Sequence, residues 1–398
     1  MAIGAGNRMR TYLHYVKEHP DQVQLVAVVE PDTLRRQRTA QQFQLPATAC
    51  FSDCDTFFAA DIAAEAVIIC TPEQVHYHPC MQAICHGYNV LLEKPIAQTL
   101  QQCHDISAAA QRHGAVVGIC HVLRYFPAYL KLRDLIHTGT LGQLIAIHHR
   151  EGVGIDRATH SYVRGTMNRE HESNPMLLAK CCHDIDLCYW LAGVRCRRVA
   201  SYGARSWFRS EHAPAGAAER CIHCSVEPTC PFSAVDLYQR RKQWISNFDI
   251  PDGQTIDDVV EQELHHGRYG RCVYRCDNDV VDHQDLIMEM DNEVTVSLAM
   301  DIFTADDTRT THVLLSHGEI HCNEQQVEVI PFGRQPRELF DYSDIMRQPF
   351  HGNADLRLFG DFIATLRGDS ATALPLIADG IESHRICFEA ERCRQRKG

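Results

Sequence analysis

A lysine follows directly after a run of residues that is typical of buried structure. The stretch Asn89–Leu100 reads NVLLEKPIAQTL, and its apolar run Val90–Leu92 predicts a buried parallel strand. An ammonium group is costly to bury near a core. Lys94 therefore either reaches water or has a chemical task, because strands of a parallel sheet present their carboxyl ends to ligands.

A second titratable group lies on a predicted helix with the sequence AKCCHDIDLCYW. His183 and Asp186 are three residues apart, and Lys180 is three residues before His183, so the three share one helix face. A nearby lysine charge keeps an imidazole neutral and able to accept a proton, and Asp186 is expected to steady the ring. The alternative is a core histidine with satisfied ring nitrogens.

Two glycines precede the first predicted helix. Gly4 and Gly6 follow the short strand stub MAI, and Asn7, Arg8 and Met9 come next. Such a glycine pair lets the backbone turn tightly and approach a pyrophosphate at a helix N-terminus. Met9 replaces the third glycine of the G-x-G-x-x-G fingerprint, so the motif is incomplete.

An acidic residue ends the next predicted strand. Glu30 lies 24 residues after Gly6, where a carboxylate binds ribose hydroxyls. It also repels a 2′-phosphate, although Arg35 and Arg36 lie one helical turn further on. Together with the glycines, Glu30 predicts a nucleotide site that takes NAD rather than NADP.

Four motifs resemble those of the Gfo/Idh/MocA oxidoreductases, the relatives of glucose–fructose oxidoreductase and inositol dehydrogenase. They are GAGNRM, VVEPD, CTPEQVHYHP and LLEKP, in this order and spacing. The segment RYFPAYLKLRDLIHTGTLGQL and the helix with His183 also fit, so the resemblance spans essentially the whole chain. It implies an N-terminal Rossmann domain and a C-terminal α+β domain with a large, mostly antiparallel open sheet.

The resemblance also implies roles for individual residues. Lys94 points into an active site, Pro95 sets the turn, often through a cis bond, and His183 lies near the nicotinamide and the substrate hydroxyl. Further cofactor-binding residues are implied by the matching motifs: Thr71, Pro72, His76 and Glu93. The chain departs from the family at Ala179, where many members carry an aspartate four residues before the histidine.

Hydride transfer from a carbinol needs a base for the hydroxyl proton and a cation for the forming alkoxide, and His183 and Lys94 provide both. Candidate substrate-binding residues lie at the start of the linking helix and in the polar loop THSYVRGTMNRE: Arg124, Tyr125, Tyr162, Arg164 and Asn168. The alternative for each residue is an ordinary surface loop.

A cysteine cluster lies in the second half of the chain. Cys221, Cys224 and Cys230 form C-x2-C-x5-C, and C-x2-C spacing suits tetrahedral zinc. The pattern predicts a structural zinc site with His223 or a distant cysteine as the fourth ligand, and Cys272 and Cys276 could complete a set. The alternative is a cysteine-rich loop without metal.

Length and composition bound the protein class. The 398 residues predict about two domains, which we place at 1–123 and 124–398, with the last helix packing back on the first domain. A net charge of −12 argues against nucleic-acid binding, and no apolar run approaches a membrane span. The 19 cysteines without a visible secretory signal predict reduced thiols in a cytoplasmic protein.

The alternation of strand and helix in the first third predicts a doubly wound parallel sheet. Later segments such as DHQDLIMEMD and EVTVSLAMDIFT predict antiparallel strands, with a hairpin turn at Asp291–Asn292. Three functions remain open: an NAD-dependent dehydrogenase acting on a sugar, sugar derivative or cyclitol; a glycosidase that oxidises transiently on the same fold; and a non-catalytic nucleotide sensor. The family implies a homodimer or homotetramer that associates through the C-terminal sheet.

Overall fold

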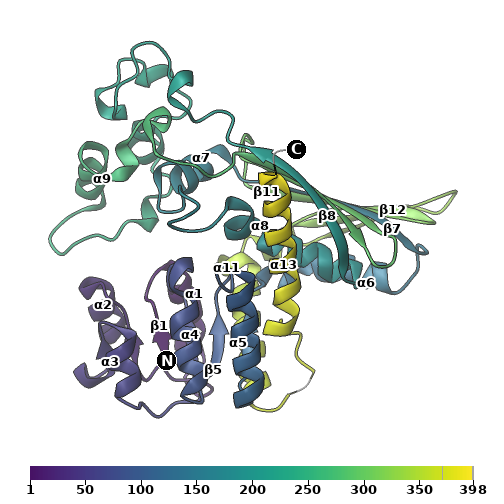
Figure 1. Cartoon of the computed structure of the whole chain (residues 1–398), viewed down its shortest axis with the longest axis horizontal. Coiled ribbons are helices and arrows are strands. Elements are labelled where there is room, and N and C mark those ends of the chain that lie inside the picture. Colours follow the sequence, from purple (N-terminus) through teal and green to yellow (C-terminus); the bar gives the residue numbers. More distant parts are fainter. Residues whose placement is uncertain (370, 397–398) are drawn as a thin grey trace.

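The computed structural model describes residues 1–369 and 371–396. Figure 1 shows a parallel sheet flanked by helices in one half of the molecule and a large curved sheet in the other half. The last helix runs between the two halves. No helix within the described ranges is long and apolar enough to cross a bilayer.

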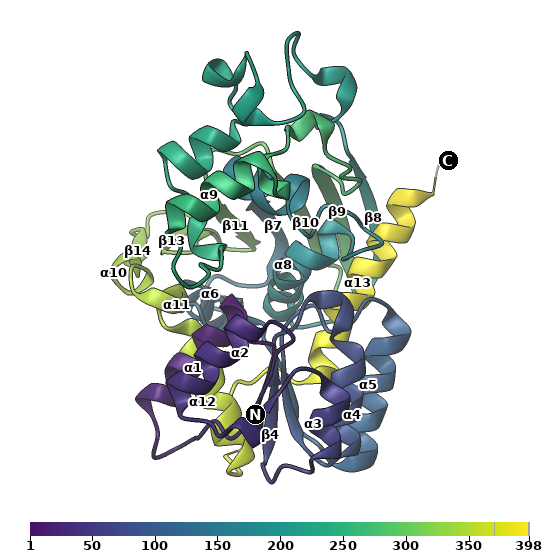
Figure 2. The same ribbon diagram turned by 90° about the vertical axis from the view of Figure 1, so that its left-hand side faces the viewer.

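The first half is a six-stranded parallel sheet with the order β3-β2-β1-β4-β5-β6. Its strands are β1 (Ala2–Ile3), β2 (Val28–Val29), β3 (Cys50–Phe51), β4 (Ala66–Ile69), β5 (Asn89–Leu92) and β6 (Val117–Ile119). Its helices are α1 (Asn7–Glu18), α2 (Thr33–Phe43), α3 (Cys54–Ala59), α4 (Tyr77–Cys85), α5 (Leu100–His113) and α12 (Ala354–Leu366). Figure 2 shows α1 and α12 on one face of the sheet and α3, α4 and α5 on the other. This is the doubly wound sheet that the alternating pattern predicts.

The second half is an eight-stranded sheet with the order β14-β13-β12-β11-β7-β10-β9-β8. Its strands are β7 (Leu144–Gly152), β8 (Cys196–Ala204), β9 (His283–Met290), β10 (Thr295–Asp301), β11 (Thr308–Leu315), β12 (Gly318–Asn323), β13 (Gln326–Pro331) and β14 (Glu338–Asp341). Only the pair β7 and β10 is parallel, and the predicted hairpin joins β9 to β10. The mostly antiparallel C-terminal sheet is thus confirmed.

Helices cover one face of this sheet. They are α6 (Pro127–His137), α8 (Met176–Ala192) and α13 (Ile377–Gln395), and short helices lie at α7 (Ile155–Ala158), α10 (Ser343–Met346) and α11 (Pro349–Gly352). α8 ends at Gly193, whose φ of +71° is the left-handed conformation that glycine adopts without strain. α13 packs against α5, α8 and β8, so it joins both halves of the chain.

Residues 205–282 form a lobe between β8 and β9, and the sequence pattern did not predict its architecture. Within it lie α9 (Ile256–His265) and several single turns, and none of the named strands. Its own core is small: Cys221, Ala234, Leu237, Tyr238, Val260 and Leu264. Figure 1 shows this lobe above α2 and α3, on the side of the molecule that carries the N-terminal glycine turn.

Candidate active site

The glycine turn between β1 and α1 has the geometry of a nucleotide-binding loop. Gly4 has φ +85°, and a Cβ there would lie 2.6 Å from the carbonyl oxygen of Cys70. A Cβ on Gly6 would meet nothing within 4 Å, and α1 has neither a side-chain cap nor an acidic residue in its first turn. Open space beside an uncapped helix N-terminus suits a pyrophosphate. Met9, in place of the third glycine, is fully buried in the core.

Glu30 lies beside this turn. Its Oε2 accepts a hydrogen bond from the amide of Ala5 at 2.6 Å, and its Oε1 accepts one from the amide of Asp32 at 3.0 Å. Each carboxylate oxygen can accept a second bond, so the group can still receive ribose hydroxyls. Glu30 thus also holds the glycine turn in place, a role that the sequence pattern did not predict.

Arg8 and Glu93, which we predicted to bind the cofactor, form an ion pair with each other. The Arg8 guanidinium donates to Glu93 at 2.7 Å and to Asp355 at 2.7 Å, and the hydroxyl of Tyr12 also donates to Glu93. Both carboxylates are buried and need a cationic partner. The cluster ties α1 to β5 and α12. The amide of Asn7, in turn, donates to the side chain of Asn247 in the lobe at 2.6 Å.

His76 is also used by the protein backbone. Its Nδ1 lies 2.7 Å from the carbonyl oxygen of Pro95 and its Nε2 3.0 Å from that of Thr71, so neither nitrogen is left for a cofactor. The ring ties the loops after β4 and β5 together. In contrast, the buried hydroxyl of Thr71 has no hydrogen-bond partner among the described residues, and Pro72 begins the next turn. Thr71 is therefore the better cofactor candidate of the three.

Lys94 lies at the carboxyl end of β5, and its peptide bond to Pro95 is cis. Its ammonium group donates to the carbonyl oxygen of Ala179 at 2.7 Å. Ala179 is one helical turn before His183 on α8. The lysine is only partly buried, and its charge is near enough to His183 to act on the pKa of that residue.

The imidazole of His183 is held neutral. Burial lowers its pKa well below the usual range, and the charges of Lys94 and His121 lower it further. Its Nδ1 has no partner among the described residues. A neutral ring with an unpaired nitrogen beside an ammonium group can exchange a proton with a bound hydroxyl.

His121 is a residue of this site that sequence reasoning missed. It follows β6, its ring centre lies 5.8 Å from that of His183, and its Nε2 lies 3.7 Å from the carboxylate of Asp186. Burial lowers the pKa of His121 to about 4, against the opposing effect of Asp186. Neither ring nitrogen has a hydrogen-bond partner within the described ranges. Its position after a parallel strand is the signal that singled out Lys94 and could have found it.

Asp186 does not steady His183, contrary to our prediction. Both of its oxygens accept hydrogen bonds from Arg124, at 2.8 and 2.7 Å, and the residue is 1% exposed. Arg124, which we predicted to line the substrate site, is therefore taken up in a bidentate ion pair. A buried carboxylate requires such a partner, and the sequence does not show which cation the fold brings to it.

Lys180 is likewise an ion-pair residue. Its ammonium lies 2.7 Å from Glu151 on β7 and 3.5 Å from Asp307. Arg309 and Asp184 extend this buried network between α8 and the sheet. The ammonium group of Lys180 is thus paired with these carboxylates, and its predicted role beside His183 stays a prediction.

Three of the remaining predicted substrate-binding residues have structural partners. The hydroxyl of Tyr125 donates to Asp361 at 2.9 Å. The amide of Asn168 donates to Asp277 at 3.1 Å, and the fully buried Arg164 donates to two backbone carbonyls of the lobe. Tyr162 is buried, and burial raises its pKa. The charge of Arg157 lowers this pKa and that of Glu73 raises it. The substrate-binding role that we predicted for Tyr162 stays a prediction.

Comparison with known proteins agrees with this geometry. Residues 1–121 match GFO_IDH_MocA, described as an oxidoreductase family with an NAD-binding Rossmann fold. A 2,7-anhydro-N-acetylneuraminate hydratase from Mediterraneibacter gnavus is 30% identical over 133 residues, covering 33% of this chain and 34% of that protein. An inositol 2-dehydrogenase from Corynebacterium glutamicum is 26% identical over 198 residues, covering 48% of this chain and 53% of that protein.

The fold extends over the whole chain. An oxidoreductase from Agrobacterium radiobacter, solved in complex with NAD+, L-tartaric acid and magnesium, superimposes with a TM-score of 0.70 at 14% identity. The match covers 98% of this chain and 94% of that one, whereas the curated relatives match over about half of their length or less. Residues 1–121 are thus similar to the NAD-binding Rossmann domain of the Gfo/Idh/MocA oxidoreductases.

Proposed function

We propose that the protein is a dehydrogenase that transfers hydride between NAD and a hydroxyl-bearing carbon of a sugar, sugar derivative or cyclitol. The observation that carries the proposal is the pairing of Lys94 with the neutral His183 at the carboxyl end of the parallel sheet. Ligands of such sheets bind at this edge. The glycine turn, Glu30 and the unpartnered hydroxyl of Thr71 supply the groups that hold the dinucleotide.

The charge of each side chain determines the role that we assign to it. NAD, when bound, supplies the hydride acceptor. His183 takes the proton of the substrate hydroxyl, because its imidazole is neutral and its Nδ1 is unpaired. Lys94 stabilises the negative charge that develops on the substrate oxygen. His121, whose ring packs edge-on against that of His183, acts as a positioning residue for the His183 ring.

The substrate class follows from the relatives. One is named for inositol and another for an anhydro sugar acid, and both classes carry several hydroxyl groups. The hydratase also supports a second candidate function, since a hydratase catalyses no net redox reaction. In that candidate, transient oxidation precedes an elimination step, as in an oxidative glycosidase.

A panel of sugars, sugar acids and cyclitols separates the two candidates. A dehydrogenase accumulates NADH with its substrate, measured by absorbance, whereas an oxidation–elimination enzyme converts its substrate without net NADH. No turnover of any panel member by the purified protein, with NAD bound, would favour the nucleotide sensor.

Substitutions test the assigned roles. Lys94→Ala and His183→Ala should each lower turnover by roughly 10²–10⁴-fold, the usual effect of a positioned acid–base group, with little change in NAD affinity. Lys94→Met should in addition raise the pKa of His183 and move the acid limb of the pH–rate profile to higher pH. Near-normal turnover of either alanine variant on the true substrate would contradict its role. Thermal melts control for loss of folding.

We also propose that the chain forms a homodimer or homotetramer through the face of the C-terminal sheet that α6, α8 and α13 leave uncovered. Ile145, Tyr202, Ile287 and Leu339 are exposed on the strands of this sheet, and Tyr202 is 78% exposed. Light scattering of Ile287→Asp, compared with the unchanged protein, tests this. A monomer in both cases, or an oligomer that survives the charge, would count against it.

A further inference from the structure

The structure brings a fourth cysteine to the cluster of three. Arg220 and Arg271 form an isolated antiparallel β-bridge, and the amide of Cys272 donates to the carbonyl oxygen of Glu219 at 2.9 Å. Cys221 and Cys272 directly follow the two bridged residues, and both line the same cavity although 51 positions separate them in the sequence. Cys224 and Cys230 each end a tight turn on the neighbouring segment.

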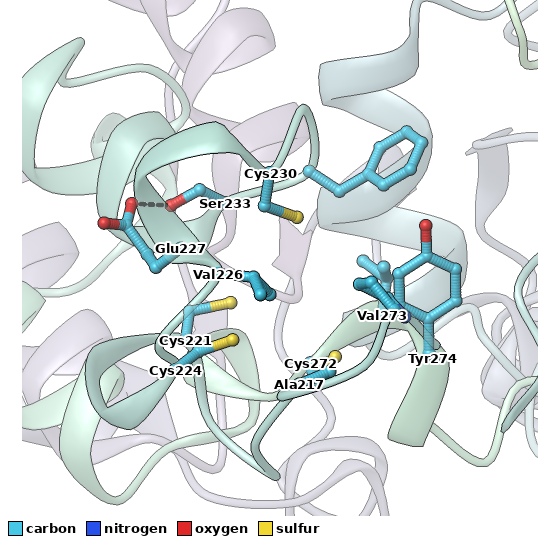
Figure 3. Close-up of a pocket in the computed structure, with 12 residues that line it drawn as sticks. Ala217, Cys221, Cys224, Val226, Glu227, Cys230, Ser233, Cys272, Val273 and Tyr274 are labelled. Atoms are coloured by element: carbon cyan, nitrogen blue, oxygen red, sulfur yellow. Dashed lines mark hydrogen bonds between the residues drawn. The ribbon is translucent and has the colours of Figure 1, made fainter. Parts of the chain in front are cut away.

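The four thiols line one small cavity, which Figure 3 shows in close-up. The remaining walls are mainly apolar: Pro214, Ala217, Val226, Phe232, Val273 and Tyr274. Glu227 also borders the cavity, but its carboxylate is engaged by Ser233 and by Arg240. The thiols are therefore the groups in this cavity that are available as ligands. Four sulfur ligands suit tetrahedral zinc.

A buried cation supports an anionic occupant. Arg164 is 0% exposed, and its Nη2 lies 3.8 Å from the sulfur of Cys221. The guanidinium donates to the carbonyl oxygens of Arg271 and Phe232, but its Nη1 has no partner within the described ranges. An unpaired buried cation is costly. Four thiolates around a divalent ion leave a net negative charge, which Arg164 would compensate.

We propose that Cys221, Cys224, Cys230 and Cys272 bind one zinc ion that holds the lobe of residues 205–282 together. The proposal goes beyond hydride transfer and does not depend on it. All four cysteines are free thiols, so none of them is taken up in a disulfide.

The thiols must close inward to bind the ion. In the part of the chain that the structure describes, the only three candidate ligand atoms within 4.8 Å of one another belong to His312, Glu319 and His321 on the sheet. A zinc–sulfur bond is about 2.3 Å long. Cys224 and Cys230 end single helical turns, and Cys272 precedes one. The cavity between them is small, which suits a single ion better than an iron–sulfur cluster.

The lobe needs such a link. Its own core of six residues is small, and small cores commonly depend on a metal or a disulfide. The lobe also reaches the nucleotide-binding half, since Asn247 accepts from Asn7 at 2.6 Å and Asp249 accepts from Arg35 at 2.8 Å. The metal would thus keep in place a segment that contacts the glycine turn.

Metal analysis of the full chain, expressed with both zinc and iron in the medium, tests the proposal. The purified protein should contain about one equivalent of zinc per chain, and Cys224→Ser and Cys272→Ser should each lose most of it. Cys276→Ser is the matched control. Cys276 is four residues after Cys272 but is not part of the cavity lining, so this variant should keep its zinc.

A second measurement applies if the serine variants fail to fold. Zinc is removed from the unchanged protein with a chelator and replaced by cobalt, which should show the visible bands of a tetrahedral thiolate complex. Hydrogen exchange should accelerate in residues 214–275 on zinc removal and stay unchanged in the parallel sheet. Absence of zinc, iron with acid-labile sulfide in its place, or zinc loss in Cys276→Ser as complete as in Cys272→Ser would overturn the proposal.

Discussion

Replacing Arg124 with methionine tests whether Arg124 is the ion-pair partner that stabilises the buried Asp186. In the structure, both oxygens of Asp186 accept from Arg124, and Nε2 of the neutral His121 lies 3.7 Å from the carboxylate. Methionine keeps much of the apolar stem of Arg124 but leaves the buried carboxylate without its charged partner. Breaking a buried ion pair from one side costs about 3–5 kcal/mol of unfolding free energy.

The cost should depend on pH. The charge of Arg124 is one of the causes that lower the pKa of His121, after burial, while Asp186 raises it. Without Arg124, the His121 pKa rises above its value of about 4, and the protonated ring then pairs with Asp186. In the unchanged protein, His121 has a lower pKa in the folded state than in the unfolded chain. Acidification therefore lowers the free energy of unfolding. The variant loses less stability on acidification, and its deficit should shrink from pH 8 to pH 5.5.

Urea unfolding followed by tryptophan fluorescence measures the loss, since Trp190, Trp207 and Trp244 all lie in the C-terminal half. Arg133→Met is the control: Arg133 stacks on Trp190 at 4.4 Å, so its loss should cost about 0.5–1 kcal/mol. A loss below about 1 kcal/mol for Arg124→Met, or an equal deficit at both pH values, would refute the reasoning. Asp186→Asn should leave the acid limb of the pH–rate profile in place, and a shifted limb would restore the role of Asp186 beside His183.

Three further predictions concern the nucleotide site and pH. Glu30→Ala should weaken NAD binding by roughly 1.5–3 kcal/mol in calorimetric titration, because a charged acceptor is lost, and tighter binding of NADP than of NAD by the unchanged protein would contradict the NAD preference. Gly4→Ala should abolish NAD binding or lower the melting temperature, because its Cβ would collide with the Cys70 carbonyl, and an unchanged titration and melt would count against the turn geometry. Burial lowers the pKa of His384 to about 3, so this histidine favours the folded state fully above about pH 6.5. The melting temperature should therefore fall as the pH drops toward 4. An equally steep fall in a His384→Asn variant would show that other groups cause it.

The local sequence pattern was sufficient for the fold class and for the glycine turn. Alternating strands and helices predicted the parallel sheet, and the long apolar strands predicted the antiparallel one, because burial on one or two faces leaves a period in the sequence. Gly4, Glu30 and Lys94 were singled out by the same logic, since each follows or ends a strand of the parallel sheet. The lobe of residues 205–282 has no such period, and its architecture could not be predicted.

The partner of each buried charge, in contrast, depends on contacts between residues distant in the chain. Asp186 shares a helix face with His183, yet it binds Arg124, 62 positions away. Arg164 lies in a polar loop typical of a substrate site, yet it is buried beside Cys221. A buried charge pairs with whichever opposite charge the packing of helices and sheets brings within hydrogen-bonding distance, and helical spacing constrains only neighbours on the same helix. For the same reason the fourth cysteine of the cluster became evident only when the β-bridge between Arg220 and Arg271 brought the segment of Cys272 to the cavity that Cys221 lines.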